Sequence, residues 1–152
     1  MLFREGFWYL VGYCHLREEI RIFRVDRIKK LEIKNTKFQV AREFSLEDFF
    51  KNSWNLGKGD SIIVKVHFNP PVSRLIRENI WHQTQKIEEI EGDSLILTVC
   101  VEGTWEIKKW ILSWGVGAIC LEPEELREEI KREIEKLVIN YNNSIKNFPD
   151  MN

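Results

Sequence analysis

The sequence has few of the features that would place it in a special class of protein. Its 152 residues include only three cysteines and four prolines, and its formal net charge is −1 at pH 7. A near-neutral chain is not a basic protein that covers DNA without regard to sequence, so any contact with nucleic acid must come from a local basic patch. No apolar run approaches the roughly 20 residues of a membrane span, and the first ten residues lack a secretory signal's apolar core. We therefore expect a globular protein of one domain or two small ones, with no membrane segment.

Residues that usually build metal, disulfide or phosphate sites are also scarce. Cys14, Cys100 and Cys120 are odd in number and widely spaced within apolar segments, which predicts free thiols in a reducing cytoplasm. No Cys or His pair has the spacing of zinc ligands. The Gly-x-Gly at residues 57–59 lacks the strand-loop-helix context of a phosphate loop. We expect no metal, no cofactor and no catalytic residue.

One stretch, residues 8–28, combines aromatic side chains with arginines. Residues 1–7 lead into an apolar strand that runs to residue 16, turns at residues 17–19 and returns over residues 20–28. β-branched and aromatic residues with a period of two predict a β-hairpin. Arginine binds phosphate or carboxylate through two parallel hydrogen bonds, and tyrosine and histidine offer stacking faces. The candidate binding residues are Tyr9, Tyr13, His15, Arg17, Arg21, Arg24 and Arg27.

Strand alternation divides the side chains of this hairpin between two faces. Tyr9, Tyr13 and His15 fall on the face where we expect a ligand, whereas Trp8 and Leu10 fall on the other face and are expected to be core. Arginines of the return strand lie on both faces. The strand register decides which of them converge, and the sequence does not fix the register.

A structural role for the arginines is the alternative to a binding face. Asp26 can pair with Arg24 or Arg27 and simply hold the hairpin together. Surface ion pairs of this kind contribute only ~0–1 kcal/mol to stability. Both interpretations stay open at the level of residue composition.

The same stretch resembles the WYL domain family of bacterial transcriptional regulators. The resemblance lies in Trp8-Tyr9-Leu10, in Tyr13 and Arg17, and in the pattern RIFRVDRI that ends at Ile28. It implies a small Sm/SH3-like β-barrel that binds nucleic acid or a nucleotide-like ligand on this hairpin. It also implies a further strand pair and a winged helix-turn-helix ahead of this point. We expect the chain to lack both, so the barrel is partial, and its free edge is expected to pair with another chain. A DNA-binding domain or chain is therefore a further expected partner.

Composition changes after the first third of the chain. Residues 52–60 are dense in Gly, Asn, Asp and Ser, which is typical of a linker. We place the partial barrel at residues 1–51, a second domain at 61–141 and a frayed tail at 142–152. Just ahead of the linker, Ser45 is predicted to cap a short helix over residues 45–50.

The second domain is predicted to alternate strands and helices. Apolar patterns predict strands at 61–68, 86–90, 94–101 and 117–121, and helices over 70–79, from Thr104 to about 114, and from Pro123 to Tyr141. The order β-α-β-β-α-β predicts a ferredoxin-like domain with a C-terminal helix, so the whole chain is α+β. Weaker motifs, WILSWG at 110–115 and LEPEELR at 121–127, resemble the WCX element that follows the WYL barrel and supports dimerisation in relatives.

These observations predict a ligand-sensing regulatory domain that performs no chemistry. The expected ligand is single-stranded DNA or RNA, or a nucleotide, and its binding is expected to shift the arrangement of a homodimer. One alternative is a structural dimerisation module without a ligand. The other is a small enzyme acting on nucleotides, which the lack of a converging acid–base pair or metal cluster disfavours.

Overall fold

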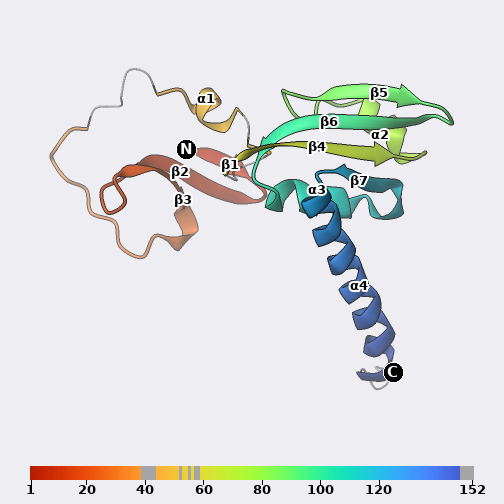
Figure 1. The fold of residues 1–152 in the computed structure, drawn as a ribbon. Helices are drawn as coiled ribbons and strands as arrows, with labels where there is room; N and C mark the ends of the chain where they lie inside the picture. The colour runs from red at the N-terminus through yellow and green to blue at the C-terminus, as the bar shows by residue number, and fades with distance from the viewer. Residues whose placement is uncertain (39–43, 52, 55, 57–58, 148–152) are drawn as a thin grey trace. The chain divides into compact units, whose positions relative to one another are not determined.

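The computed structural model describes residues 1–38, 44–51, 53–54, 56 and 59–147, and it divides into two compact units, Met1–Phe49 and Phe50–Asn152 (Figure 1). Within the described residues the fold is α+β, with two antiparallel sheets and four α-helices. The predicted linker at 52–60 and the predicted tail at 142–152 both lie partly outside the described residues. None of the described helices combines the length and apolar content needed to cross a membrane.

The first unit contains a three-stranded sheet in the order β1-β2-β3. Its strands are β1 (Leu2–Arg4), β2 (Phe7–Cys14) and β3 (Glu19–Arg24). The prediction that residues 1–7 merely lead into the hairpin is therefore wrong, because β1 pairs with β2 from Leu2 to Arg4. Glu5 and Gly6 both have positive φ, 46° and 82°, which is the backbone of a two-residue hairpin turn. A strand this short gives no clear period-two signal in the sequence.

The β2–β3 hairpin is confirmed, with different ends from those predicted. Its turn lies at residues 15–18, where the Cys14 carbonyl accepts the backbone N–H groups of Arg17 (3.1 Å) and Glu18 (2.7 Å). Strand β3 ends at Arg24 and does not continue to Ile28, because Val25–Arg27 form a 3-10 turn, η1. The Ile28 N–H closes this turn on the Val25 carbonyl at 3.1 Å. The chain thus leaves the sheet immediately after Arg24.

The expected core face of β2 is exposed. Trp8 is 54% and Leu10 is 40% solvent-accessible, and no described residue from Met1 to Phe38 is buried. The prediction that Trp8 and Leu10 form core is therefore wrong. A three-stranded sheet has two faces, and side chains on a face become core only where a second layer covers them.

Following the sheet, helix α1 (Leu46–Phe50) begins as predicted, and the Ser45 hydroxyl accepts the Asp48 N–H at 3.1 Å.

The second unit has the predicted order of strands and helices. Its elements are β4 (Ser61–Phe68), α2 (Val72–Arg77), β5 (Lys86–Ile90), β6 (Ser94–Glu102), α3 (Trp105–Ser113), β7 (Ala118–Glu122) and α4 (Glu124–Asn147). The four strands form one antiparallel sheet in the order β5-β6-β4-β7. Alternate residues of β4 and β6, Ile76 of α2, and Ile107 and Ile111 of α3 belong to one buried apolar cluster. The helices α2 and α3 therefore pack on one face of the sheet (Figure 1).

Helix α4 is longer than predicted. Leu126 and Ile130 in its first turns are buried in the core of the second unit. Beyond them the helix extends away from the sheet and ends at Asn147, six residues after the predicted end at Tyr141 (Figure 1). Residues 142–147, the first part of the predicted tail, therefore belong to the helix. Adding a residue to an existing helix costs far less than starting one, so a weak polar segment continues a strong amphipathic one.

Candidate ligand-binding site

The register of the β2–β3 hairpin decides which arginines share a face with which aromatic residues. Tyr9 lies opposite Arg24 and Tyr13 lies opposite Ile20, whereas Gly12 lies opposite Arg21. Residues that face each other across an antiparallel pair point to the same side of the sheet. Arg24 therefore shares a face with Tyr9 and Tyr13, and Arg21 lies on the other face.

A pocket lies where β3 passes into η1, beside the start of β2. Its volume is about 570 Å³, which falls within the roughly 300–1,000 Å³ of small-molecule sites. The lining residues are Tyr9, Ile22, Phe23, Arg24, Arg27 and Ile28. Three predicted residues, Tyr9, Arg24 and Arg27, are brought together here. Ile22, Phe23 and Ile28 were not predicted as lining residues, because the strand register that places them was not known.

Arg24 is the most constrained cation of this pocket. Its Nε and Nη2 atoms donate to the two carboxylate oxygens of Asp26 at 2.8 Å and 2.6 Å, and its guanidinium carbon lies 3.9 Å from the centre of the Phe7 ring. The hydrogen bond from Arg24 holds the pKa of Asp26 below its usual range, and the same bond raises the pKa of Arg24. Both groups are therefore charged at neutral pH, and the ion pair foreseen as a structural alternative is present.

The other candidate residues do not line this pocket. His15 and Arg17 lie in the turn between β2 and β3, and the rings of Tyr13 and His15 are 5.2 Å apart in an edge-on arrangement. Arg21 donates from Nη1 to Glu19 at 2.6 Å on the opposite face. The predicted set is thus divided between the pocket, the turn and the far face.

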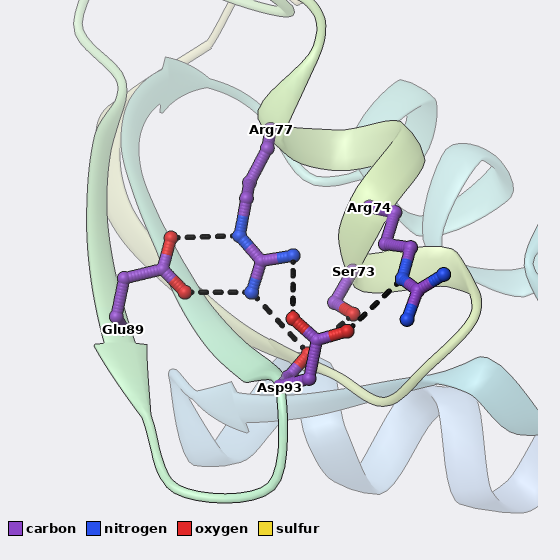
Figure 2. Close-up of polar contacts among 5 residues, drawn as sticks. All are labelled: Ser73, Arg74, Arg77, Glu89 and Asp93. Carbon is purple, nitrogen blue, oxygen red and sulfur yellow. Dashed lines mark hydrogen bonds and ion pairs between the residues drawn. The ribbon is translucent and has the colours of Figure 1, made fainter.

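The second unit has an arginine cluster that is already neutralised (Figure 2). Arg77 donates to both carboxylate oxygens of Glu89, at 2.8 Å and 2.7 Å, and its Nη1 lies 3.0 Å from a carboxylate oxygen of Asp93. Arg74 donates to the other oxygen of Asp93 at 3.0 Å, and the Ser73 hydroxyl donates to the Asp93 carbonyl at 2.6 Å. These bonds tie α2 to the β5–β6 turn. With carboxylates on its guanidinium groups, the cluster is suited to structure and not to anion binding.

Several tryptophans of the second unit pack against one another. Trp110 packs 4.6 Å from Trp54 and 5.3 Å from Trp81, measured between ring centres, and His82 stacks on Trp54 at 5.8 Å. The His82 Nδ1 accepts the Thr84 N–H at 3.2 Å, and burial lowers the pKa of His82. His82 is therefore neutral, and the cluster is apolar packing around one uncharged ring.

The described residues offer little for metal or nucleophilic chemistry. No group of three or more His, Cys, Asp or Glu among them could hold a metal ion. Cys120 is buried, and burial raises the pKa of its thiol to about 11. A thiol with such a pKa stays protonated at neutral pH and is a poor nucleophile.

The chain matches two domain families and several known proteins. The WYL domain family matches residues 1–33 and the WCX domain family matches residues 60–138. The chain is 27% identical over 134 residues to a protein of Bacillus subtilis (strain 168) named uncharacterized HTH-type transcriptional regulator YobV, with 86% of this chain and 41% of the relative covered. It therefore spans about two fifths of that relative's length.

Solved structures are more distant in sequence. A CRISPR Cas-related protein superposes with a TM-score of 0.56 and 14% identity, over 92% of this chain and 41% of that one. The proteasome accessory factor B/C (PafBC) of Arthrobacter aurescens is similar with a TM-score of 0.39 and 18% identity, over 86% of this chain and 20% of that one. The WCX match covers more than half of the 152 residues, and the WYL match precedes it on the hairpin that builds the pocket. The protein therefore belongs to the family of WYL and WCX domain proteins.

Proposed function

We propose that this protein is a regulatory domain that binds a phosphate-bearing ligand, either single-stranded nucleic acid or a nucleotide, in the pocket of Tyr9, Arg24 and Arg27. The observation that carries the proposal is the pairing of Tyr9 with Arg24 across β2 and β3, which puts a phenol ring and a guanidinium on one face. Arg27 adds a second cation to the same pocket. Stacking surfaces beside cations are the usual means of binding single strands.

Arg24 retains donors for such a ligand. A guanidinium has five N–H groups in a fixed fork, and Asp26 accepts from Nε and Nη2. In the described part of the chain no hydrogen bond occupies the Arg24 Nη1 atom. One edge of the guanidinium therefore remains available to a phosphate oxygen, with Phe7 fixing the plane of the group.

The regulatory role is proposed from the relatives. The curated relative is named as an HTH-type transcriptional regulator, and this chain carries the WYL and WCX domains without an identified catalytic group among its described residues. We propose that it senses its ligand in transcriptional regulation and performs no chemistry. A partial Sm/SH3-like barrel for residues 1–51 and a ferredoxin-like domain for 61–141 remain our proposed folds. The sheet order β5-β6-β4-β7 supports the second of these.

The test is fluorescence anisotropy of a labelled single-stranded DNA oligonucleotide titrated with the full chain at several salt concentrations. Binding should weaken steeply with salt, since phosphate contacts release counterions. Arg24→Gln should reduce affinity about tenfold or more, since hydrogen bonds to charged groups contribute ~1.5–3 kcal/mol.

Arg21→Gln is the matched comparison. It also removes one positive charge and one ion pair to a neighbouring carboxylate, but on the opposite face of the hairpin. We expect its affinity loss to be clearly smaller. A folded protein that binds no oligonucleotide excludes single-stranded nucleic acid as the ligand, and equal losses in the two variants contradict the proposed site.

Exposed apolar residues on α4 favour a second role, association. Ile134, Leu137, Val138 and Tyr141 are each at least 45% exposed, and they follow helical spacing beyond the buried Ile130. We propose that this stripe pairs with a second copy, so that ligand binding acts on a homodimer. Analytical ultracentrifugation should show a dimer that Leu137→Glu dissociates. If the protein is a dimer but binds no ligand, the alternative function as a structural dimerisation module is favoured.

A further inference from the structure

We infer that Asp26 is a built-in competitor for the ligand's phosphate at Arg24, and that it thereby sets the affinity of the pocket. This inference rests on the proposed function and adds to it a residue that sets affinity. Asp26 does not line the pocket itself. It acts through the guanidinium that it holds.

The geometry of the pair is that of an anion already bound. The two oxygens of Asp26 accept from Nε and Nη2 of Arg24 at 2.8 Å and 2.6 Å. Parallel bonds of this kind are the arrangement in which an arginine also takes a phosphate. A phosphate can contact the open Nη1 atom of Arg24 with one oxygen while Asp26 stays bound, but it must displace the Asp26 carboxylate to form a two-pronged contact with Nε and Nη2.

The displaced Asp26 carboxylate can move into solvent, whereas the Arg24 guanidinium stays in place. The Asp26 side chain is 50% exposed and the Arg24 side chain is 26% exposed. Asp26 can turn into water at little cost, as expected for an exposed ion pair. Phe7 still supports the guanidinium, whose carbon lies 3.9 Å from the ring centre. When Asp26 is removed, the Arg24 guanidinium therefore stays packed on the Phe7 ring and presents its free N–H groups.

Charge gives the direction of the effect. Arg24 and Arg27 bring two positive charges to the pocket, and Asp26 cancels one of them. Arg24 keeps the pKa of Asp26 below its usual range, so the carboxylate remains ionised at neutral pH. A phosphate that binds Arg24 takes the place of the Asp26 carboxylate as its partner. Affinity reports the difference between the phosphate and the carboxylate as partners of Arg24.

Arg77 in the second unit is a comparison case, in which carboxylates occupy every nitrogen of the guanidinium. Carboxylate oxygens contact its Nε, Nη1 and Nη2 atoms, two from Glu89 and one from Asp93 (Figure 2). Arg24 has one edge occupied and the other open beside a pocket. A partly occupied guanidinium is the condition under which a carboxylate can tune affinity without abolishing it.

The experiment compares Asp26→Asn with Glu19→Gln in the full chain. Each variant replaces a carboxylate by an amide of similar shape. Each thereby removes the negative charge that pairs with one arginine of β3. Glu19 pairs with Arg21 on the face away from the pocket. Both variants are titrated against the same labelled single-stranded DNA oligonucleotide as the wild type, and thermal unfolding verifies that each is folded. Asp26→Ser replaces Asp26→Asn if the latter does not fold.

Asp26→Asn should tighten binding about three- to tenfold at low salt, and it should steepen the salt dependence by up to about one released counterion. Glu19→Gln should change affinity less than about twofold, because its charge is screened and lies on the other face. Equal tightening in the two variants would mean a general charge effect and would overturn the inference.

The outcomes also separate this inference from the proposed function. If the wild type binds, Arg24→Gln loses binding, and Asp26→Asn binds equally or more weakly, the site stands and Asp26 only orients Arg24. That result overturns the inference alone. If neither the wild type nor Asp26→Asn binds the oligonucleotide or a labelled nucleotide, the proposed function fails and the inference fails with it.

Discussion

Tyr9 of β2 and Arg24 of β3 lie directly opposite each other in the hairpin ladder. This register puts the phenol ring and the guanidinium on one face, where both line the pocket together with Arg27. Arg21, three residues earlier on the same strand, lies on the other face. The two arginines of β3 therefore lie on opposite faces of the hairpin, and of these two only Arg24 lines the pocket.

Arg27 should contribute to ligand binding through its charge. Arg27→Gln is expected to weaken oligonucleotide binding about three- to tenfold, because it removes one phosphate-facing cation from the pocket. Lys30→Gln is the control, since Lys30 is exposed and pairs with Glu32 at 2.6 Å outside the pocket. Anisotropy titrations at two salt concentrations measure both. Similar losses for Arg27 and Lys30 would indicate non-specific attraction.

Stability should fall on mild acidification because of His82. Burial lowers the pKa of His82 in the folded protein, so the unfolded chain binds a proton more readily. Stability is then constant above the ordinary histidine pKa of about 6.5 and decreases as pH falls below it. Thermal unfolding between pH 8 and pH 5.5 should show this slope.

His82→Asn tests the assignment of that slope. The asparagine can still accept the Thr84 N–H that His82 Nδ1 accepts at 3.2 Å, but it does not titrate. The variant should be less stable throughout and should have a shallower dependence on pH. An unchanged slope would assign the acid sensitivity to other groups.

Ile76 should be a stability determinant of the second unit. It is completely buried against the sheet, so Ile76→Ala should lower the free energy of unfolding by ~2–5 kcal/mol. Ile80, four residues later, is 86% exposed, and Ile80→Ala should cost less than ~0.5 kcal/mol. Denaturant unfolding followed by tryptophan fluorescence measures both. Comparable losses would contradict the observed packing of α2.

Gly117 should not tolerate a side chain. A Cβ atom there would lie 2.5 Å from a methyl carbon of Val72, so Gly117→Ala should cost ~1–3 kcal/mol through overpacking. Val72→Ala in the same chain should recover part of that loss, because it removes the clashing methyl group. A double-mutant cycle measured by denaturant unfolding gives the coupling between the two positions. Strict additivity would show that the contact is absent.

Local patterns in the sequence were sufficient for most of the fold of the second unit. The apolar alternation of β4 predicted its ends at Ser61 and Phe68, and the order of strands and helices was confirmed. Ser45 also caps α1 as predicted. These features depend on hydrogen bonds and side-chain periodicity within a few residues, so neighbouring residues contain the necessary information.

The ends of elements and the burial of faces were predicted less well. Strand β3 stops at Arg24, where a bond between the side chains of Arg24 and Asp26 accompanies the 3-10 turn. Trp8 and Leu10 have the composition of core residues and are exposed. An apolar side chain in a strand shows which face it belongs to, but whether a second layer covers that face is a property of the whole molecule.

The sequence by itself determined that Tyr9 and Arg24 belong to an arginine and aromatic hairpin of the WYL type, with Arg27 close behind it in the chain. Only the tertiary structure decided that these three residues meet in one pocket and that Arg21 lies on the opposite face. The physical reason is the two-residue period of a strand. A shift of one position in the pairing moves every side chain of one strand to the other face, and the geometry of the turn at residues 15–18, which sets the pairing, cannot be read from side-chain periodicity.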